Sequence, residues 1–350
     1  MNIARIETWW EEIALRRPYR IAHQDTASVE MGFARVVLED GTQGFGCAAP
    51  VEEITGESSA ACRAALAHAA RGEMGGFRLL ARLESEFAKT PAARSALDSA
   101  LHDAASRARG LALVDLFGRV VAPLETSVTL GIRPLGETLA EADEHSAAGL
   151  RVLKVKIGED LSQDVERLVR LRERFGARMV LRADANVGYG VPDIERFFAL
   201  TEHIHVEFLE QPVPRGLDDE VRRLPASIRA RLVADESLLD LSDAVRLARE
   251  PRPYGMWNIK LAKCGGVTPA REIARVAEAH GIDLMWGCMD ESVVGIAAAL
   301  HIAYACKATR YLDLDGSLDL ARDPFRGGFE LKNGVMTTLK APGLGVEMNA

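Results

Sequence analysis

The chain has 350 residues, of which 48% are hydrophobic and 27% charged, and its formal net charge is −8. This composition excludes disordered, collagen-like and coiled-coil chains, and no apolar run reaches the ~18–20 residues of a membrane-spanning helix. Nucleic acid is not expected as a partner, because the 43 basic residues form no stripe that could neutralise phosphates. We therefore expect a soluble globular enzyme or binding protein with neither a nucleic-acid nor a membrane partner.

The N-terminus and the cysteines predict a cytoplasmic protein. The opening residues, MNIARIETWWEE, contain no apolar core and no small-residue cleavage site, so they do not resemble a secretion signal. The cysteines are odd in number and include no C-x-x-C pair, which favours reduced thiols over disulfides or a zinc site. They are Cys47, Cys62, Cys264, Cys288 and Cys306.

The first ~115 residues predict a small α+β domain. Strands are expected at 30–38 and 44–50, on either side of a hairpin signal at Asp40-Gly41. Small apolar residues at helical spacing then predict helices over 58–70 and 93–109. Strands followed by helices are typical of an α+β arrangement.

From about residue 124 the pattern changes to short strands that alternate with helical stretches. Eight strands over about 200 residues predict a (β/α)8 barrel. A doubly wound sheet is less favoured, because no glycine-rich phosphate loop opens a helix. The strands are expected at 127–132, 153–157, 179–186, 205–212, 231–237, 257–263, 283–289 and 311–315. We predict a modified TIM-type barrel over 119–324 and an N-terminal capping domain over 1–118, to which 325–350 returns.

Charged residues end these strands at nearly constant spacing. Lys156, Asp184, Glu210, Asp235 and Lys260 follow one another at steps of 28, 26, 25 and 25 residues. One strand and one helix per step would give this spacing, and it predicts that all five side chains lie at the same rim of the barrel.

The three carboxylates Asp184, Glu210 and Asp235 predict a metal site for a hard cation such as Mg²⁺, because all the ligands are oxygens. Zinc would require His or Cys, which occupy none of these positions. The alternative interpretation is that each acid is an independent salt-bridge or cap residue, and it weakens because all three are in register.

Lysines flank the three acids and predict proton transfer. Lys156 lies one strand before them and Lys260 one strand after, while Lys154 points to the same side as Lys156. We expect burial and the neighbouring cation to lower the lysine pKa toward the range of a general base. Two lysines on opposite faces of a metal-held carboxylate could remove and return the adjacent proton, as in a racemase or epimerase.

At these residues the sequence resembles the muconate-lactonising-enzyme subgroup of the enolase superfamily, over nearly its whole length. The motifs are K-V-K (154–156), D-A-N (184–186), E-Q-P (210–212), A-D-E-S (234–237), N-I-K-L-A-K-C-G-G (258–266) and G-C-M (287–289). The resemblance implies one Mg²⁺ per subunit on the three acids and an acid/base pair of lysines. It also implies that Lys154 tunes the pKa of Lys156, that Asn186 supports the metal site, and that the protein is a homo-oligomer.

The segment D-L-D-G (313–316) resembles the D-x-D of dipeptide epimerases, in which two aspartates bind the α-ammonium group of the substrate. The resemblance therefore implies Mg-dependent epimerisation of L-Ala-L-Xaa to L-Ala-D-Xaa through an enediolate, with Asp313 and Asp315 on the substrate. Where Ala-Glu epimerases carry an arginine, this sequence has His23. His23 and Asp290 are candidate substrate-binding residues. Asp290 near the barrel mouth and Glu52 and Glu53 on the second capping loop would form an acidic rim, which favours a dipeptide with a basic or polar C-terminal residue.

Three other functions compete with this prediction. o-Succinylbenzoate synthase, N-acylamino-acid racemase or cycloisomerase activity would use the same metal and lysines, but their substrates have no α-ammonium group for the D-x-D. A Schiff-base aldolase would need only one lysine and no metal carboxylates. A metal-bound binding module without catalysis would not need both lysines.

Overall fold

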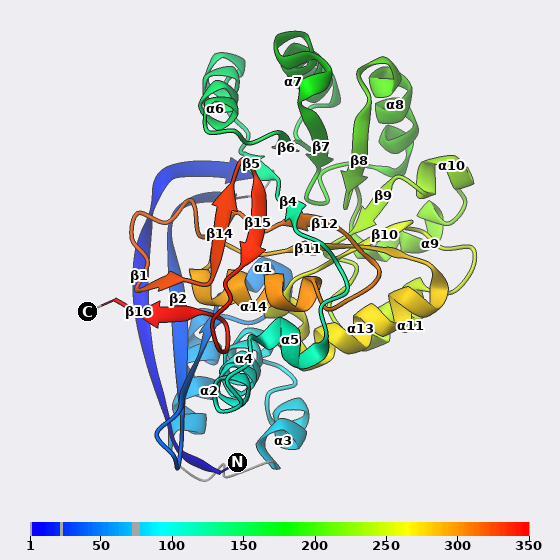
Figure 1. Ribbon diagram of the computed structural model, residues 1–350. Helices are drawn as coiled ribbons and strands as arrows, with labels where there is room; N and C mark the ends of the chain where they lie inside the picture. The colour runs from blue at the N-terminus through cyan, green and yellow to red at the C-terminus, as the bar shows by residue number, and fades with distance from the viewer. Residues whose placement is uncertain (1, 22–23, 72–77, 350) are drawn as a thin grey trace.

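The computed structural model describes residues 2–21, 24–71 and 78–349. An antiparallel sheet and a set of helices form one end of the molecule, and a parallel barrel forms the other (Figure 1). The antiparallel sheet contains β1 (Ile3–Ile21), β2 (Gln24–Leu38) and β3 (Gln43–Ala48), in that order. The strands predicted at 30–38 and 44–50 correspond to β2 and β3, whereas β1 was not predicted.

Helix α4 (Pro91–Arg107) packs directly on this sheet. Its buried face is made of small residues, so its backbone comes very close to β3. A Cβ at Gly44 would lie 2.2 Å from the Ala100 carbonyl oxygen, and one at Gly46 would lie 1.9 Å from that of Ala96. Glycine is therefore required at both positions. The remaining helices of this region are α1 (Glu52–Thr55), α2 (Ser59–Ala70), α3 (Arg78–Glu86) and α5 (Leu113–Phe117).

The eight predicted barrel strands are all present within a few residues of their expected positions. They form one parallel sheet in sequence order. The strands are β5 (Val128–Leu130), β6 (Val152–Lys156), β7 (Val180–Asp184), β8 (Val206–Glu210), β9 (Leu232–Ala234), β10 (Met256–Ile259), β11 (Asp283–Gly287) and β12 (Thr309–Asp313). The first and last strands meet where the Ser127 amide donates to the Leu312 carbonyl at 3.1 Å, which nearly closes the barrel.

Helices cover the outside of the barrel, and several of them are amphipathic. In α7, for example, Leu168, Leu171 and Phe175 face the core at helical spacing. The helices are α6 (Leu135–Ala147), α7 (Leu161–Phe175), α8 (Val191–Thr201), α9 (Asp218–Val221), α10 (Ala226–Arg229), α11 (Leu241–Leu247), α12 (Leu261–Cys264), α13 (Val267–His280) and α14 (Val293–Ala303). The barrel and capping-domain prediction is therefore confirmed.

After β12 the chain forms short strands that contact the first part of the sequence. Strand β13 (Phe325–Gly327) pairs with β16 (Val346–Met348), and β14 (Phe329–Lys332) and β15 (Val335–Thr338) form a sheet with β4 (Leu124–Glu125). The Phe325 ring lies 5.1 Å from that of Phe45 and 5.6 Å from that of Phe33. The Phe325 contacts support our proposal that 325–350 belongs with a capping domain over 1–118, whereas β14 and β15 form a sheet with β4, inside the proposed barrel domain 119–324.

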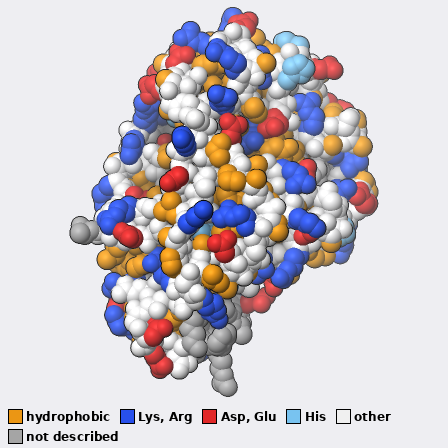
Figure 2. All heavy atoms as spheres, viewed as in Figure 1, with side chains coloured by type: hydrophobic (Ala, Val, Ile, Leu, Met, Phe, Trp, Pro, Cys, Tyr) orange, Lys and Arg blue, Asp and Glu red, His pale blue; other side chains and the backbone are white. Residues whose placement is uncertain are grey.

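Basic, acidic and apolar side chains are interspersed on the face shown in Figure 2. Within the described ranges, no helix combines the length and the apolar character needed to cross a bilayer. All five cysteines are free thiols.

Candidate active site

The strand registers bring the charged strand ends to one rim of the barrel. Lys156 is opposite Asp184 in the β6–β7 pair, and Asp184 is opposite Glu210 in the β7–β8 pair. Asp235 follows the last residue of β9, and Lys260 stands between β10 and α12. The structure therefore collects the evenly spaced residues at the carboxyl ends of neighbouring strands, where barrel enzymes carry their active sites.

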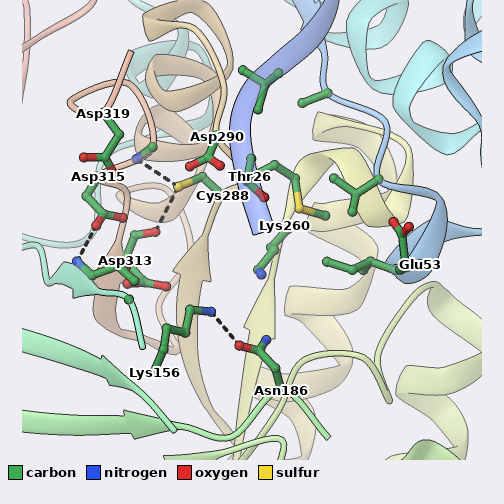
Figure 3. Close-up of a pocket in the computed structure, with 18 of the residues that line it drawn as sticks. Thr26, Glu53, Lys156, Asn186, Lys260, Cys288, Asp290, Asp313, Asp315 and Asp319 are labelled. Carbon is green, nitrogen blue, oxygen red and sulfur yellow. Dashed lines mark hydrogen bonds between the residues drawn. The ribbon is translucent and has the colours of Figure 1, made fainter. Parts of the chain in front are cut away.

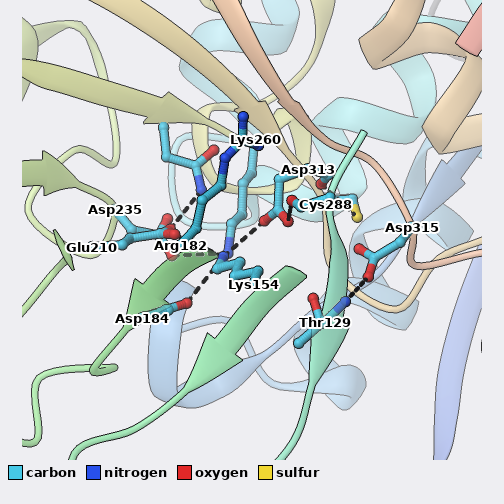
Figure 4. Close-up of polar contacts among 12 residues, drawn as sticks. Thr129, Lys154, Arg182, Asp184, Glu210, Asp235, Lys260, Cys288, Asp313 and Asp315 are labelled. Atoms are coloured by element: carbon cyan, nitrogen blue, oxygen red, sulfur yellow. Dashed lines mark hydrogen bonds and ion pairs between the residues drawn. The ribbon is translucent and has the colours of Figure 1, made fainter. Parts of the chain in front are cut away.

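The Lys154 ammonium lies at the centre of the buried acids (Figure 4). Its Nζ atom is 3.0 Å from Asp184 Oδ2, 2.7 Å from Glu210 Oε2 and 2.7 Å from Asp313 Oδ2. Asp184, Glu210 and Asp235 are completely buried. A buried carboxylate is strongly destabilising unless a counter-charge accompanies it, and Lys154 supplies that charge.

The other two lysines each hold one of the acids. Lys156 Nζ donates to Asp184 Oδ2 at 2.8 Å and to Asn186 Oδ1 at 2.9 Å. Lys260 Nζ donates to Asp235 Oδ2 at 2.8 Å. Asn186 thus contacts a lysine directly and, through its own amide, also reaches Glu236 Oε1 at 3.3 Å.

The expectation of lowered lysine pKa values is wrong for Lys154 and Lys260. Burial lowers the pKa of each lysine, but the surrounding carboxylates outweigh burial and raise both pKa values above the ordinary range. Asp235 is the main cause at Lys260, and Asp184 is the main cause at Lys154. Burial and the neighbouring Asp184 charge raise the pKa of Glu210 to about 8. The sequence shows that the lysines are close to one another, but it does not show how closely the carboxylates surround each ammonium group, and these contacts decide the direction of the pKa shift.

The acids also have the chemistry of a site for a hard divalent cation. All the available donor atoms are carboxylate oxygens, which suit Mg²⁺. Glu210 Oε2 is a buried atom that makes no hydrogen bond in the described structure, although the Lys154 ammonium lies nearby. No three acidic, His or Cys side chains among the described residues already form a close-set ligand group. Lysine ammonium groups neutralise these carboxylates instead.

Three side chains without a role in the sequence analysis hold the same acids in place. Asn258 Nδ2 donates to Glu210 Oε1 at 2.7 Å. Lys263 Nζ contacts Asp235 Oδ1, and Gln211 Oε1 accepts from the Asp235 amide at 2.9 Å. Asn258 and Lys263 lie in the same motif as Lys260, two residues before it and three after it. Their spacing, on one strand face and then one helical turn, is the signal that could have found them.

A cavity of about 330 Å³ opens above this rim and extends beneath the capping domain (Figure 3). This volume is in the range of small-molecule sites. Its floor contains Lys154, Lys156, Asn186 and Lys260. Figure 3 shows Asp290, Asp313, Asp315 and Asp319 on one side of the two lysines and Glu53 on the other.

Three of the four predicted substrate-binding residues line the cavity. Asp290, Asp313 and Asp315 line the cavity, as do the loop residues Glu52 and Glu53. Asp313 Oδ1 accepts from Ser127 Oγ at 2.5 Å, and Asp315 Oδ2 accepts from the Thr129 amide at 2.6 Å. His23 lies outside the described residues.

Comparison with known proteins agrees with this geometry over both regions of the chain. The sequence pattern "Mandelate racemase / muconate lactonizing enzyme, N-terminal domain" matches residues 5–118, and "Enolase C-terminal domain-like" matches residues 137–350. An L-Lys-D/L-Arg epimerase of Methylococcus capsulatus is 51% identical, with 99% of each chain covered. Another, from Desulforapulum autotrophicum, is 48% identical with the same coverage. The chain belongs to the dipeptide epimerases of the enolase superfamily.

A solved structure extends the comparison to three dimensions. The Methylococcus capsulatus dipeptide epimerase complexed with Mg and the dipeptide L-Arg-D-Lys superimposes with a TM-score of 0.97 at 50% identity, covering 99% of each chain. The resemblance stated from the motifs is thus confirmed, and the protein is an isomerase.

The epimerase also has cavity residues that were not predicted, Asp319 and Glu141 among them. Burial and the charges of Asp315, Asp290 and Glu141 raise the pKa of Asp319 to about 8. Burial and Asp313 likewise raise the pKa of Asp315 to about 6. Crowding of like charges in this wall therefore makes Asp315 and Asp319 harder to ionise.

Proposed function

We propose that this epimerase acts on dipeptides with basic side chains and inverts the α-carbon of the C-terminal residue. The observation that supports this proposal best is the acidic lining on two sides of the lysine pair. One wall contains Asp290, Asp315 and Asp319, and the other contains Glu53. Glu52, the neighbour of Glu53 in the chain, also lines the cavity.

Other acids of the cavity are neutralised by the protein itself. Glu141 lies 3.4 Å from the Arg133 guanidinium and 3.9 Å from that of Arg17, and Glu30 lies 3.3 Å from that of Arg63. No ion pair with a lysine or arginine is found for Asp315, Asp319, Glu52 or Glu53 in the described part of the chain. A cationic ligand between the two walls would relieve their mutual repulsion. The two related epimerases named for L-Lys-D/L-Arg point to the same class of substrate.

The proposed roles follow from the position of each side chain. Asp184, Glu210 and Asp235 would hold Mg²⁺, as their oxygen donors and burial suit that ion. Mg²⁺ held there would supply positive charge to oppose the negative charge that develops on the substrate carboxylate, and it would compete with Lys156 and Lys260 for the carboxylate oxygens that they now contact. Lys154, whose ammonium now contacts Asp184 and Glu210, would stay beside the metal site as a second positive charge.

Lys156 and Lys260 approach the cavity from different strands of the barrel. We propose that one of them takes the α-proton as the Cα–H bond breaks, and that the other donates a proton to the opposite face of the same carbon. Asn186 positions Lys156 through its 2.9 Å hydrogen bond. Asp313 and Asp315 would receive the α-ammonium group at the N-terminus of the dipeptide.

The test compares L-Lys-L-Arg with L-Ala-L-Arg and L-Ala-L-Glu, following loss of the C-terminal α-proton signal by ¹H NMR in D₂O with Mg²⁺. We expect L-Lys-L-Arg to react best and L-Ala-L-Glu worst. The L-Ala-L-Xaa dipeptides that the sequence analysis predicted would then be slower substrates of the same enzyme. Faster turnover of L-Ala-L-Glu would refute the basic-dipeptide proposal.

Nα-acetyl-L-arginine serves as the control for the alternative functions, because it lacks the α-ammonium group. If this compound exchanges its α-proton with D₂O while the dipeptides do not, the result would favour the N-acylamino-acid racemase alternative. We also propose that the enzyme is a homo-oligomer of the reducing cytoplasm. The free thiols support the compartment, and light scattering tests the oligomeric state.

A further inference from the structure

The segment that carries Lys260 also carries two side chains aimed at the proposed metal ligands. Asn258 lies in β10 and is completely buried, and Lys263 lies in α12 and is 3% exposed. A tight turn brings Lys263 back beneath Lys260, as its amide donates to the Lys260 carbonyl at 3.1 Å. Neither side chain lines the cavity.

All three N–H groups of the Lys263 ammonium have acceptors. Besides Asp235 Oδ1, it contacts the Asp235 carbonyl oxygen at 2.6 Å and the Asn258 carbonyl oxygen at 3.2 Å. Lys263 therefore fixes both the side chain and the backbone of Asp235. The other carboxylate oxygen, Oδ2, faces Lys260 at 2.8 Å.

Asn258 does the same for the neighbouring ligand. Its amide nitrogen holds Glu210 Oε1, so that Oε2 is left facing the Lys154 ammonium at 2.7 Å. The Asn258 side chain packs against Gly287 on the adjacent strand, where only glycine leaves it room, because a Cβ there would lie 2.5 Å from its oxygen. Each carboxylate thus has one oxygen bound by a side chain outside the cavity, Asn258 or Lys263, and its other oxygen faces a lysine of the cavity floor, Lys154 or Lys260.

We infer that Asn258 and Lys263 are positioning residues for the metal site, each orienting one carboxylate so that a single oxygen of it is presented to Mg²⁺. This inference rests on the proposed ligand roles of Glu210 and Asp235. Outer groups that orient metal ligands commonly change metal affinity 10- to 100-fold when they are removed. The single segment 258–263 would then carry both the base Lys260 and the supports of two metal ligands.

The experiment is calorimetric titration of Mg²⁺ into the substrate-free full chain. We expect Asn258→Leu and Lys263→Gln each to raise the Mg²⁺ dissociation constant about 10- to 100-fold. Because Asn258→Leu changes no charge, its result decides the matter even if Lys263→Gln does not fold. Activity of the Asn258→Leu variant should recover as Mg²⁺ is raised, which a merely structural defect would not do.

Two controls separate the possible failures. Lys307→Gln removes the same charge from an exposed lysine and should leave the Mg²⁺ affinity unchanged. Asp235→Asn removes a proposed ligand and should nearly abolish binding; wild-type affinity here would overturn the proposed metal site itself. If Asp235→Asn weakens binding while both positioning variants bind Mg²⁺ as tightly as the wild type or more tightly, the positioning inference alone is overturned.

Discussion

Replacing Asp319 by asparagine removes one negative charge from the cavity wall with almost no change in side-chain size. Asp319 lies in the segment between β12 and β13, close enough to Asp315 for that charge to raise its pKa. Since Asp315 is our proposed receptor for the α-ammonium group, Asp319 should face the side chain of the N-terminal residue. A basic side chain there would form a charge-assisted hydrogen bond.

The size of the effect follows from that bond. A hydrogen bond to a charged group contributes about 1.5–3 kcal/mol, and 1.4 kcal/mol corresponds to a factor of ten. We therefore expect Asp319→Asn to lower kcat/KM for L-Lys-L-Arg by about 10- to 150-fold at pH 8.5, where Asp319, whose pKa is raised to about 8, carries its charge. L-Ala-L-Arg has no cation at that position, so its kcat/KM should change by less than about threefold.

The assay measures initial rates of both dipeptides by ¹H NMR in D₂O, for the wild type and for Asp319→Asn. Glu330→Gln is the matched control, because it makes the same charge change at an exposed residue of β14, away from the cavity. An equal loss with both dipeptides, or no loss with either, would refute the assignment of Asp319 to the N-terminal side chain.

Three further predictions test other parts of the site. Lys156→Ala and Lys260→Ala should each reduce epimerisation about 10²- to 10⁴-fold. Each variant should still exchange the α-proton of one epimer, detected by ¹H NMR, and the exchanged epimer should differ between the two variants. Exchange of both epimers by either variant would contradict the two-base scheme. Because the pKa of Asp319 is raised to about 8, this side chain gains its negative charge as the pH rises. The ratio of kcat/KM for L-Lys-L-Arg between the wild type and Asp319→Asn should therefore grow from pH 6.5 to 8.5. A ratio that does not change with pH would contradict the role of the Asp319 charge. Lys154→Met leaves buried carboxylates unpaired and should lower the free energy of unfolding by about 3–5 kcal/mol in urea with EDTA, whereas unchanged stability would show that Lys154 does not balance them.

Much of the barrel could be predicted because its strands are short apolar runs with a charge at one end. The near-constant spacing of Asp184, Glu210 and Asp235 follows from one strand and one helix per step, and the paired strands place these acids at one rim. Strand β1 was missed because charged residues and paired tryptophans interrupt its alternation. Strand β14 pairs with β15 across the Asn333-Gly334 turn, a hairpin signal that the sequence analysis overlooked. Strands β13 and β16 were missed because they pair across a long stretch of chain and depend on distant contacts, such as that of Phe325 with Phe45.

The site itself was less completely predictable, because its properties depend on packing. The lysine pKa values depend on how many carboxylates surround each ammonium, and the sequence gives no such count. Asp319 and Glu141 reach the cavity from segments far apart in the chain. The spacing of Lys263 from Lys260 could have marked it as a site residue, but its contact with Asp235 depends on the turn of α12.

The most direct test of the central claim is one NMR measurement. Purified protein in D₂O with Mg²⁺ and L-Lys-L-Arg should lose the α-proton signal of arginine, keep that of lysine, and accumulate the L-Lys-D-Arg epimer. EDTA should stop both processes, and Mg²⁺ should restore them. Exchange at the lysine α-carbon, or an exchange rate that EDTA leaves unchanged, would contradict a metal-dependent epimerase that acts on the C-terminal residue of a basic dipeptide.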